Sequence, residues 1–596
     1  MASDTAISRR DVDQLPAPSR SEAPSPSPWS RRRTVRRGGG VRDADRDGRT
    51  DGRTAVARRR SAVAATVLVA AVPIVVLLVL RKFLSASLWF NEQWRAEFIS
   101  YPGGWLQGMR ADHLASIAVG WFLVERWAAE IFGSTELVLR VPAAAFLVVD
   151  AVLIYRLGRR WMPGPAAVTV ALVGSLAPQL VAYGVQLSPY DVDAASVIAV
   201  LLLFEVGHDR TTRWAQAWPG VLCYAGIGLA CFVGSATVIV AAPVLMMDAL
   251  GALRSRAERW RIFAIAGAGV LAIVNLVVEL GQNAKGEYAY WATGYPPHGV
   301  VSQVHFYLHG LKAFVQTGLT DWPAQAGMPG ALRWLLVALW TALVATGVVT
   351  VVRRRVGVAL LVALVGSLLV TLVTSELRAW PWGYQRTNLF EVPLLVLLAG
   401  IGAIGAVRTL WPRRTRLRAW PGSRLWVRPA RAAIDLTVLA AVVVAAVFTI
   451  GGIARSATSP TTGRYGTRIP EAVADVRAAA EPDAAVIVVG ALAIPGWDYY
   501  LFEYQGTSVD DGPAIPRDHV LFTQEDGVRS ITSFVARMHA SEVFLYVAQG
   551  STGPQVGSDL ARLAAAGYCT TTSIKLYRLS GGTRSVARGG ACPAAP

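Results

Sequence analysis

Long apolar runs alternate with short polar segments from Ser61 to about residue 455. The first run, Ser61–Leu80, starts too late for a signal peptide, has no clear cleavage site and is long enough to cross a bilayer. Ten further runs follow: Leu137–Leu157, Pro165–Tyr183, Val192–Val206, Ala217–Phe232, Ala236–Leu253, Ile262–Leu280, Leu332–Val352, Val356–Thr374, Leu389–Val407 and Ala432–Ile453. The pattern therefore predicts a polytopic α-helical membrane protein with about 11 spans.

Two of these segments need a closer reading. Residues 217–253 form either two short spans or one long helix, and one helix would reverse the orientation of everything that follows. Residues 114–130 carry Trp121, Phe122 and Trp127 but are too short and too charged to span. We expect this stretch to form a helix on the outer membrane surface, where aromatic side chains are favoured.

The pattern changes again at both ends of the chain. Residues 1–60, rich in Pro, Ser, Gly, Arg and Asp, have no apolar period, and we expect a disordered cytoplasmic tail. From about Ala454, the sequences AAVIVVG, EVFLYVAQ and SIKLYRL read as strands, and WDYYLFEY, GVRSITSFVARMHA and SDLARLAAAGY as helices. They predict a small α/β domain over residues 456–580, followed by a flexible tail over 581–596.

The positive charge of the chain orients the spans. The formal net charge is +18 over 596 residues, of which only 16% are charged. Residues 1–60 contribute +7, from 15 Arg and eight acids, and residues 408–431 contribute +8, from eight Arg. Both segments flank apolar runs, so the charge indicates cytoplasmic loops and excludes a nucleic-acid-binding face.

Basic clusters support the count of spans. With a cytoplasmic N-terminus, every even-numbered span ends at one of these inside clusters: Arg156/Arg159/Arg160, Arg210/Arg213, Arg254/Arg256/Arg259/Arg261, Arg353/Arg354/Arg355 and residues 408–431. Arg81 and Lys82 lie on the other side and are an exception. The clusters favour two spans in 217–253, and an odd total places the C-terminal domain outside the cytoplasm, as expected for a multi-pass protein of a bacterial plasma membrane.

Cysteine and histidine add little chemistry. Cys569 and Cys592 share the outer side in this topology, where they either form a disulfide or stay unpaired. The seven His are scattered and predict no metal site, and the sequence predicts no cofactor, although it leaves a divalent metal open.

Ionisable groups near the outer ends of the spans are the candidate functional residues, because burying them unpaired is costly. In SLWFNEQWRAEF, Asn91, Glu92 and Arg95 lie among aromatic residues, where a carboxylate is suited to act as a general base. The alternative is a solvated interfacial loop. Asp112 and His113 form either part of a site or the N-cap of the surface helix.

Two further segments complete the set. Tyr190 lies in an outside hairpin, YGVQLSPYDVDA, that a turn and a helix start also explain. Arg378 and Arg386 lie in an outside loop, and the guanidinium of Arg386 suits a lipid-linked phosphate. The alternative for both arginines is contact with phospholipid headgroups.

The order of the segments LWFNEQWRAEF, DHLASIAVGWFLVERWAAEIFGSTELVLRVPAAAFLVVDAVLIYRLGRR, YGVQLSPYDVDAASV and YQRTNLFEVPLLVLLAG resembles the GT-C superfamily of membrane glycosyltransferases. The nearest resemblance is to the bacterial branch similar to dolichyl-phosphate-mannose protein mannosyltransferases and aminoarabinose transferases. It covers residues 61–455, including the outer loop 81–136.

The resemblance implies roles for several residues. In that family an Asp of the first outer loop, usually followed by Glu, is the catalytic carboxylate, but this chain has Asn91 before Glu92. Either Glu92 takes the role, or it is the neighbouring Glu and its catalytic partner is lost. The resemblance also implies that Asp112 and His113 face the acceptor and that Arg386 meets the donor phosphate.

The sequence therefore predicts an inverting glycosyltransferase that uses a polyprenyl-phosphate sugar at the outer face. Glu92 would accept the proton of an acceptor hydroxyl, with Arg386 and Arg378, and Arg95 in the first loop, as candidates for the phosphate. The acceptor is a lipid, glycan or protein of the cell envelope. The alternatives are an inactive relative that binds or moves a lipid-linked glycan or displays its α/β domain, and a transporter, for which paired internal repeats are expected.

Overall fold

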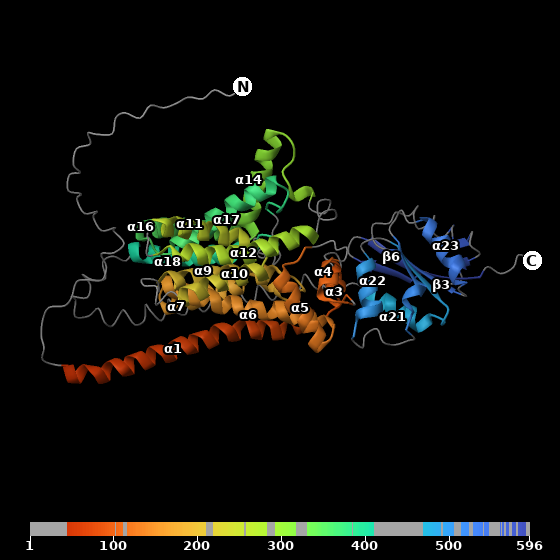
Figure 1. Cartoon of the computed structure of the whole chain (residues 1–596), viewed down its shortest axis with the longest axis horizontal. Coiled ribbons are helices and arrows are strands. Elements are labelled where there is room, and N and C mark those ends of the chain that lie inside the picture. The colour runs from red at the N-terminus through yellow and green to blue at the C-terminus, as the bar shows by residue number, and fades with distance from the viewer. Residues whose placement is uncertain are drawn as a thin grey trace, which may run out of the picture. The chain divides into compact units, whose positions relative to one another are not determined.

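The computed structural model describes part of the chain, and Figure 1 shows its elements. The described residues are 44–101, 103–110, 116–209, 218–254, 258–282, 292–317, 330–383, 386–410, 469–489, 493–505, 514–523, 528–539, 542–547, 561, 563–564, 568–570, 575–579 and 582–591. Two compact units divide at Ser61, one of residues 1–61 and one of residues 62–596.

Each predicted span in the described residues falls on a helix or a broken helix. These are α1 (Ala44–Val79), α6 (Glu136–Trp161), α7 (Gly164–Ser175) with α8 (Pro178–Gly184), α9 (Tyr190–Asp209), α10 (Trp218–Val233), α11 (Thr237–Leu253), α12 (Trp260–Gln282), α16 (Gly330–Arg354), α17 (Val358–Glu376) and α18 (Glu391–Leu410). Of the described helices, five are long and apolar enough to cross a membrane, or six if one bent pair counts as a span. The predicted span Ala432–Ile453 lies outside the described residues.

Two breaks follow from local sequence. Helices α7 and α8 meet at a bend of 58° just before Pro178, whose ring disfavours helical geometry at the preceding residue. Helices α10 and α11 are separate, with the turn at Gly234–Ala236 between them, so this structure does not contain the long single helix over 217–253. The side chain of Asp193 accepts a hydrogen bond from Ala236 N at 3.0 Å and thereby holds this turn.

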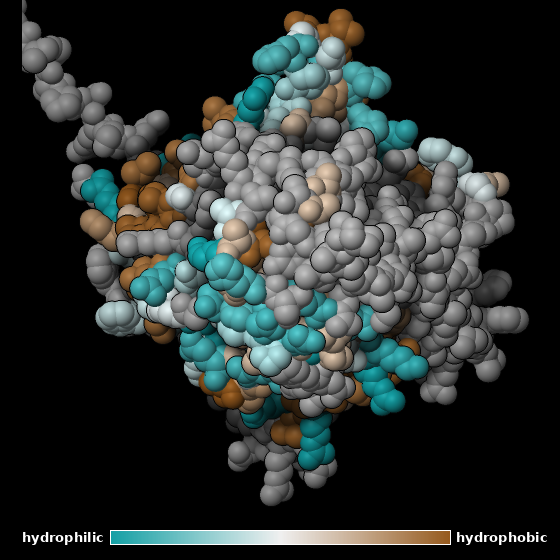
Figure 2. All heavy atoms as spheres, turned by 90° about the vertical axis from the view of Figure 1, so that its right-hand side faces the viewer, coloured by the Kyte–Doolittle hydropathy of each residue, from teal (hydrophilic) through white to brown (hydrophobic). Residues whose placement is uncertain are grey.

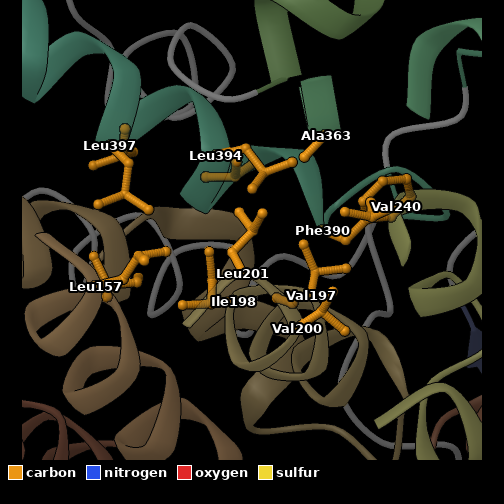
Figure 3. Close-up of a cluster of buried hydrophobic side chains, with 14 of the residues drawn as sticks. Leu157, Val197, Ile198, Val200, Leu201, Val240, Ala363, Phe390, Leu394 and Leu397 are labelled. Atoms are coloured by element: carbon orange, nitrogen blue, oxygen red, sulfur yellow. The ribbon is translucent and has the colours of Figure 1, made fainter. Parts of the chain in front are cut away.

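The core of the helical part lies between helices far apart in sequence. Figure 3 shows Ile198 and Leu201 of α9 facing Leu394 and Leu397 of α18. Helices α16 and α18 approach closely, since a Cβ added at Gly402 would meet the backbone oxygen of Leu343. Small residues permit such close packing between membrane helices.

Large apolar side chains also remain exposed on the span helices, which is unusual for a protein in water. Val270, Ile273 and Val277 of α12 follow one side of that helix and are more than half exposed. Figure 2 shows one face of the molecule, on which hydrophobic residues reach the surface beside hydrophilic ones. Exposed apolar helices of this length agree with a multi-pass membrane protein.

Short helices connect the spans at the end where α6 and α9 begin. They include α2 (Arg81–Leu84), α3 (Phe90–Ser100), α4 (Trp105–Arg110), α5 (Val119–Phe132), η3 (Ala292–Gly294) and α14 (Val300–Thr317). Helix α5 begins within the segment 114–130 that was expected to form a surface helix, and it ends two residues beyond that segment. It buries Trp121 and Phe122 and exposes Trp127 and Phe132, while its position on a membrane stays a prediction.

The C-terminal part contains a mixed sheet with helices on both faces (Figure 1). The strands are β1 (Ala485–Val489), β2 (Val520–Thr523), β3 (Glu542–Val547), β4 (Tyr568–Thr570), β5 (Lys575–Leu579) and β6 (Gly582–Ala591), in the order β2-β1-β3-β6-β4, with β5 also paired to β6. Strands β2, β1 and β3 are parallel, and β6 is antiparallel to β3.

Successive side chains of the strands point to opposite faces of the sheet, and helices pack on both faces. The helices of this part are α21 (Ile469–Ala479), α22 (Ile494–Asp498), the π-helix η4 (Tyr499–Glu503), the 3-10 helix η6 (Arg517–His519) and α23 (Val528–Met538). Val486 and Val488 of β1 pack with α21, α22 and η4. Ile487 of the same strand packs with α23 on the other face, as expected for a strand buried on both sides.

Three expectations differ from the structure or lie beyond it. The tail expected over 581–596 contains strand β6, which the sequence did not reveal because its Gly, Arg and Ser residues have no apolar alternation and its ladder comes from neighbouring strands. Helix α1 begins at Ala44, within the segment expected to be disordered, because an established apolar helix extends into flanking residues at little cost. Cys592 lies outside the described residues, so the Cys569–Cys592 disulfide stays untested.

Candidate functional site

Helix α3 carries the first group of candidate residues and is fixed at its first turn. Glu92 is buried, and its Oε2 accepts a hydrogen bond from Trp89 N, just before the helix, at 2.7 Å. A carboxylate that returns to the start of its own helix in this way pairs a backbone N–H group that has no partner within the helix.

Arg140 of α6 holds the same carboxylate from the other side. Its Nε donates to Glu92 Oε1 at 2.8 Å and its Nη2 to Oε2 at 2.7 Å, and both side chains are buried. The remaining guanidinium hydrogens go to backbone oxygens of the segment before α3, including that of Phe83 at 2.9 Å. Leu187 N also donates to Oε1, at 2.6 Å. Glu92 is therefore a fully bonded partner of a buried arginine.

Tyrosines of η4 and its flank extend this network into the C-terminal part. Tyr500 OH accepts a hydrogen bond from Leu88 N at 2.7 Å and donates to Glu136 Oε1 at 3.3 Å. Tyr504 OH donates to Glu136 Oε2 at 2.7 Å. Burial raises the pKa of Tyr500 well above its usual value, so this hydroxyl stays protonated and keeps a hydrogen to donate.

A second buried group, called here the Arg95 cluster, consists of Arg95, Glu125 and Asp193 from α3, α5 and α9. Glu125 is fully buried, and neither carboxylate oxygen has a hydrogen-bond partner among the described residues. The same is true of Nη1 of Arg95. Burial raises the pKa of Glu125 to about 8, and the positive charge of Arg95 and the side chain of Trp121 oppose this rise.

Helix α12 borders the Arg95 cluster with polar side chains. Asn275 Oδ1 accepts from Val119 N, the first residue of α5, at 2.8 Å, and Asn275 Nδ2 donates to Glu279 at 3.3 Å. Arg95 and Glu279 both act electrostatically on Asp193. Residues from α3, α5, α9 and α12 thus gather one cation, three acids and an amide at one end of the helices.

Glu97, one turn after Gln93 on α3, faces the C-terminal part. Burial raises its pKa to about 7, and the nearby carboxylates of Asp498 and Glu503 add to the rise. Arg517 opposes it and is ion-paired with Asp498 at 2.5 Å. Three carboxylates therefore share one arginine where α3 meets α22 and η4.

The structure locates most of the residues predicted from the sequence. Asn91, Glu92 and Arg95 lie on α3, with Asn91 half-buried. Tyr190, half-buried at the start of α9, packs edge-to-face on Tyr183 at 5.0 Å. The hydrogen bonds of Glu92 go to Arg140, Leu187 and Trp89, so they do not connect it to the predicted phosphate ligands.

Two of those ligands, Arg378 and Arg386, lie between α17 and α18, whereas Arg95 lies on α3. Arg378 is exposed and has a positive φ of 56°, and Arg386 is half-buried close to the start of α18. Asp112 and His113 lie outside the described residues.

Sequence reasoning missed the partners that define these groups. Neither Arg140 nor Glu125 was predicted to have a role, although Glu125 lies in the segment 114–130 expected to form a surface helix. One signal was available for Glu125, since it lies four residues after Trp121 and therefore on the same face of α5 as that buried side chain. No group of three or more His, Cys, Asp or Glu suited to a metal ion occurs among the described residues.

Comparisons with known proteins agree with the sequence resemblance. Residues 116–278 match the family model described as dolichyl-phosphate-mannose-protein mannosyltransferase. A comparison with curated proteins finds no match.

Solved structures give the fold of nearly the whole chain. ArnT from Cupriavidus metallidurans bound to undecaprenyl phosphate is 18% identical, with a TM-score of 0.52, and the match covers 88% of this chain and 97% of ArnT. The apo state of ArnT matches at 17% identity and TM-score 0.52, covering 89% and 98%. An oligosaccharyltransferase of Archaeoglobus fulgidus matches more weakly, at 14% identity and TM-score 0.45, covering 87% and 74%. The predicted resemblance is thus confirmed: residues 116–278 match the mannosyltransferase family model, and the chain shares the fold of ArnT.

Proposed function

We propose that the protein is an inverting glycosyltransferase that moves a sugar from a polyprenyl phosphate to an acceptor hydroxyl. The observation that carries the proposal is the Arg95 cluster, in which buried acids gather around a half-buried arginine at one end of the helices. Buried ionisable groups in a membrane protein are costly and mark sites of function. The undecaprenyl phosphate in the matched ArnT structure supports a lipid-linked donor.

The proposed reaction is a single displacement. The acceptor oxygen attacks the anomeric carbon, the bond from that carbon to the phosphate oxygen breaks, and the lipid phosphate leaves with the electron pair. Arg386 is the proposed ligand of this phosphate, with Arg378 beside it in the same segment, because guanidinium donors stabilise the developing negative charge. Tyr190 is a proposed wall of the donor site, and Asp112 and His113 stay candidates at its acceptor side.

Glu92 has a different position from the one expected of a proton acceptor. Both of its oxygens are occupied by Arg140 and by backbone N–H groups. Proton transfer to Glu92 would require these bonds to break. We therefore assign Glu92 a positioning role: it fixes α3 against α6 and sets the direction of Asn91 and Arg95.

The orientation belongs to the proposal as well. The distribution of arginine favours a cytoplasmic N-terminus and places the Arg95 cluster and the C-terminal sheet at the outer face of a plasma membrane. The acceptor would then be a lipid, glycan or protein of the cell envelope.

The test uses the purified full chain in lipid nanodiscs with radiolabelled undecaprenyl-phosphate sugars. We expect release of undecaprenyl phosphate, by transfer to an acceptor or by slow hydrolysis. The Arg386→Ala variant should reduce this release by a factor of about 10² or more, since it removes a charged donor to the leaving group. The matched control is Arg353→Ala, which removes an arginine from the last turn of α16.

A second candidate function follows from Asn91, since an amide cannot accept a proton at neutral pH. In that case the chain binds or moves a lipid-linked glycan without chemistry. Binding of undecaprenyl phosphate without transfer or hydrolysis of any sugar donor would favour this second function over the first.

A further inference from the structure

We propose that Glu125 accepts the proton of the acceptor hydroxyl and so replaces the carboxylate that Asn91 lacks. The inference rests on the proposed glycosyltransferase function and deepens it, since it names the group that makes the reaction possible without an Asp at position 91. It moves the base from α3 to the neighbouring helix α5.

The first argument is the unmet hydrogen-bonding capacity of Glu125. Buried polar side chains in folded proteins nearly always have a partner, and an unpaired buried charge costs several kcal/mol. Both oxygens of Glu125 are buried without a partner among the described residues, as is Nη1 of Arg95. Glu92, which accepts four hydrogen bonds, shows how the fold treats a carboxylate with a structural role. Unpaired atoms of opposite charge in one place fit a polar ligand such as a sugar or acceptor hydroxyl.

The second argument is the presence of a cation. Asp150 and Asp191 are also buried with unpaired oxygens, but Asp191 faces the like charge of Asp150, and no basic side chain acts on either among the described residues. Glu125 has Arg95 near enough to favour its ionised form. A base must be able to lose its proton, so Glu125 is suited to the role and the aspartate pair is not.

The third argument is the position of Asn91. Residues 91 and 95 are four apart on α3 and therefore share one face of the helix. Helix α3 packs against α5, and Arg95 connects the two helices through its effect on Glu125. The proposed base thus acts on the side of α3 that carries Asn91.

Few other charges face Glu125. Helix α10, which packs on α5, contains no acidic or basic residue over 218–233. On α6, Arg140 and Glu136 are engaged by Glu92 and by tyrosines. On α12, Glu279 acts electrostatically on Asp193. Among the described residues, Arg95 is the cation that lowers the pKa of Glu125, against the larger effect of burial.

The proton balance is simple. As the acceptor oxygen bonds to the anomeric carbon, its proton passes to a carboxylate oxygen of Glu125, and the lipid phosphate leaves with the electrons of the broken bond. Glu125 then returns the proton to water. Since the pKa of Glu125 is raised to about 8, transfer should increase with pH up to about pH 8 and level off above it.

The experiment measures the pH profile of kcat/KM with an undecaprenyl-phosphate sugar for the full chain in nanodiscs. Glu125→Gln should lower transfer by a factor of about 10² to 10⁴ and abolish the rise toward pH 8, with binding of undecaprenyl phosphate unchanged. Arg95→Gln should move the rise to higher pH, because the lost cation no longer favours the carboxylate. The matched control is Glu130→Gln, an exposed glutamate of the same helix, which should behave as the wild type.

The outcomes are distinguishable. Wild-type turnover together with an unchanged rate and profile in Glu125→Gln would overturn the inference and leave the proposed function intact. A wild-type protein that neither transfers nor hydrolyses the sugar would overturn the proposed function and the inference with it. If Glu125→Gln fails to fold, Glu125→Asp supplies the same test: it should keep the pH rise and lower kcat, because the carboxylate is retained but displaced.

Discussion

Glu92 and Glu125 are both buried carboxylates near an arginine, yet their surroundings differ. Glu92 receives four hydrogen bonds from Arg140, Leu187 and Trp89. Glu125 receives none from the described residues, although Arg95 acts on it. A saturated carboxylate stabilises the fold, whereas an unsaturated one keeps its bonding capacity for something else. Burial and charge alone therefore do not distinguish a structural acid from a reactive one.

At the opposite end of the helices, Asp248 is a second buried acid whose carboxylate is hydrogen-bonded. Asp248 of α11 accepts from Arg261 of α12 at 3.2 Å and from the hydroxyl of Tyr224 of α10. His208 of α9 lies 3.7 Å away. Four helices meet at this carboxylate, which makes it a structural counterpart of Glu92 rather than of Glu125.

The largest expected effect on stability belongs to Glu92→Gln. It removes the charge that pairs with buried Arg140, and breaking a buried pair from one side costs about 3–5 kcal/mol. Glu125→Gln should leave the free energy of unfolding nearly unchanged, because no hydrogen bond from the described residues is lost. Denaturant titration in detergent micelles measures both. Equal losses for the two variants would remove the distinction between the two carboxylates.

Asp248→Asn should have a smaller effect. The amide keeps a hydrogen bond to Tyr224 but loses the charge that faces Arg261, and a hydrogen bond to a charged group contributes about 1.5–3 kcal/mol. The control is His208→Gln at the exposed edge of the same cluster, for which we expect a change within about 0.5 kcal/mol. Equal melting temperatures for the two variants would show that the hydrogen bonds of Asp248 do not stabilise the fold as those of Glu92 are expected to do.

Glu97 should give the smallest effect, visible as a dependence on pH. Its pKa is about 7 in the folded protein against an ordinary value of 4.5, so the folded state keeps a proton that the unfolded state loses. The stability it contributes is complete below about pH 4.5 and is lost as the pH rises through 7. Glu97→Gln should reduce the loss of stability across this range.

The control for this measurement is Glu481→Gln, which changes an exposed glutamate. The pKa values of Asp498 and Glu503 are also raised, so some dependence should remain in Glu97→Gln. An identical slope of melting temperature against pH in the wild type and Glu97→Gln would contradict a raised pKa of Glu97 in the folded protein.

Much of the fold could be predicted because apolar runs report spans directly. The ten runs that fall in described residues each coincide with a helix or the broken pair α7 and α8. The bend in that pair was hidden because both halves are apolar, although Pro178 marks it. Strand β6 was missed because its register comes from β3, β4 and β5, which no local pattern reveals.

The candidate site was harder to predict than the fold. The sequence predicted that the segment of α3 is functional and that Glu92 is its carboxylate, but the partner Arg140 lies 48 residues away and Leu187 lies 95 away. Neither distance leaves a periodic signal. Glu125 resembled any polar residue of an amphipathic helix, since its isolation from hydrogen-bond donors exists only in three dimensions.

The bond between Leu88 and Tyr500 has a consequence for how the protein is made. These residues are 412 positions apart, so the segment before α3 leaves the ribosome long before its partner is synthesised. Leu139, Leu187 and Ile99 likewise share an apolar cluster with Trp497 and Tyr499. The region around Glu92 therefore reaches its final form among the last events of biogenesis, and a chain that stops before Ile469 would contain every predicted span while leaving this region incomplete.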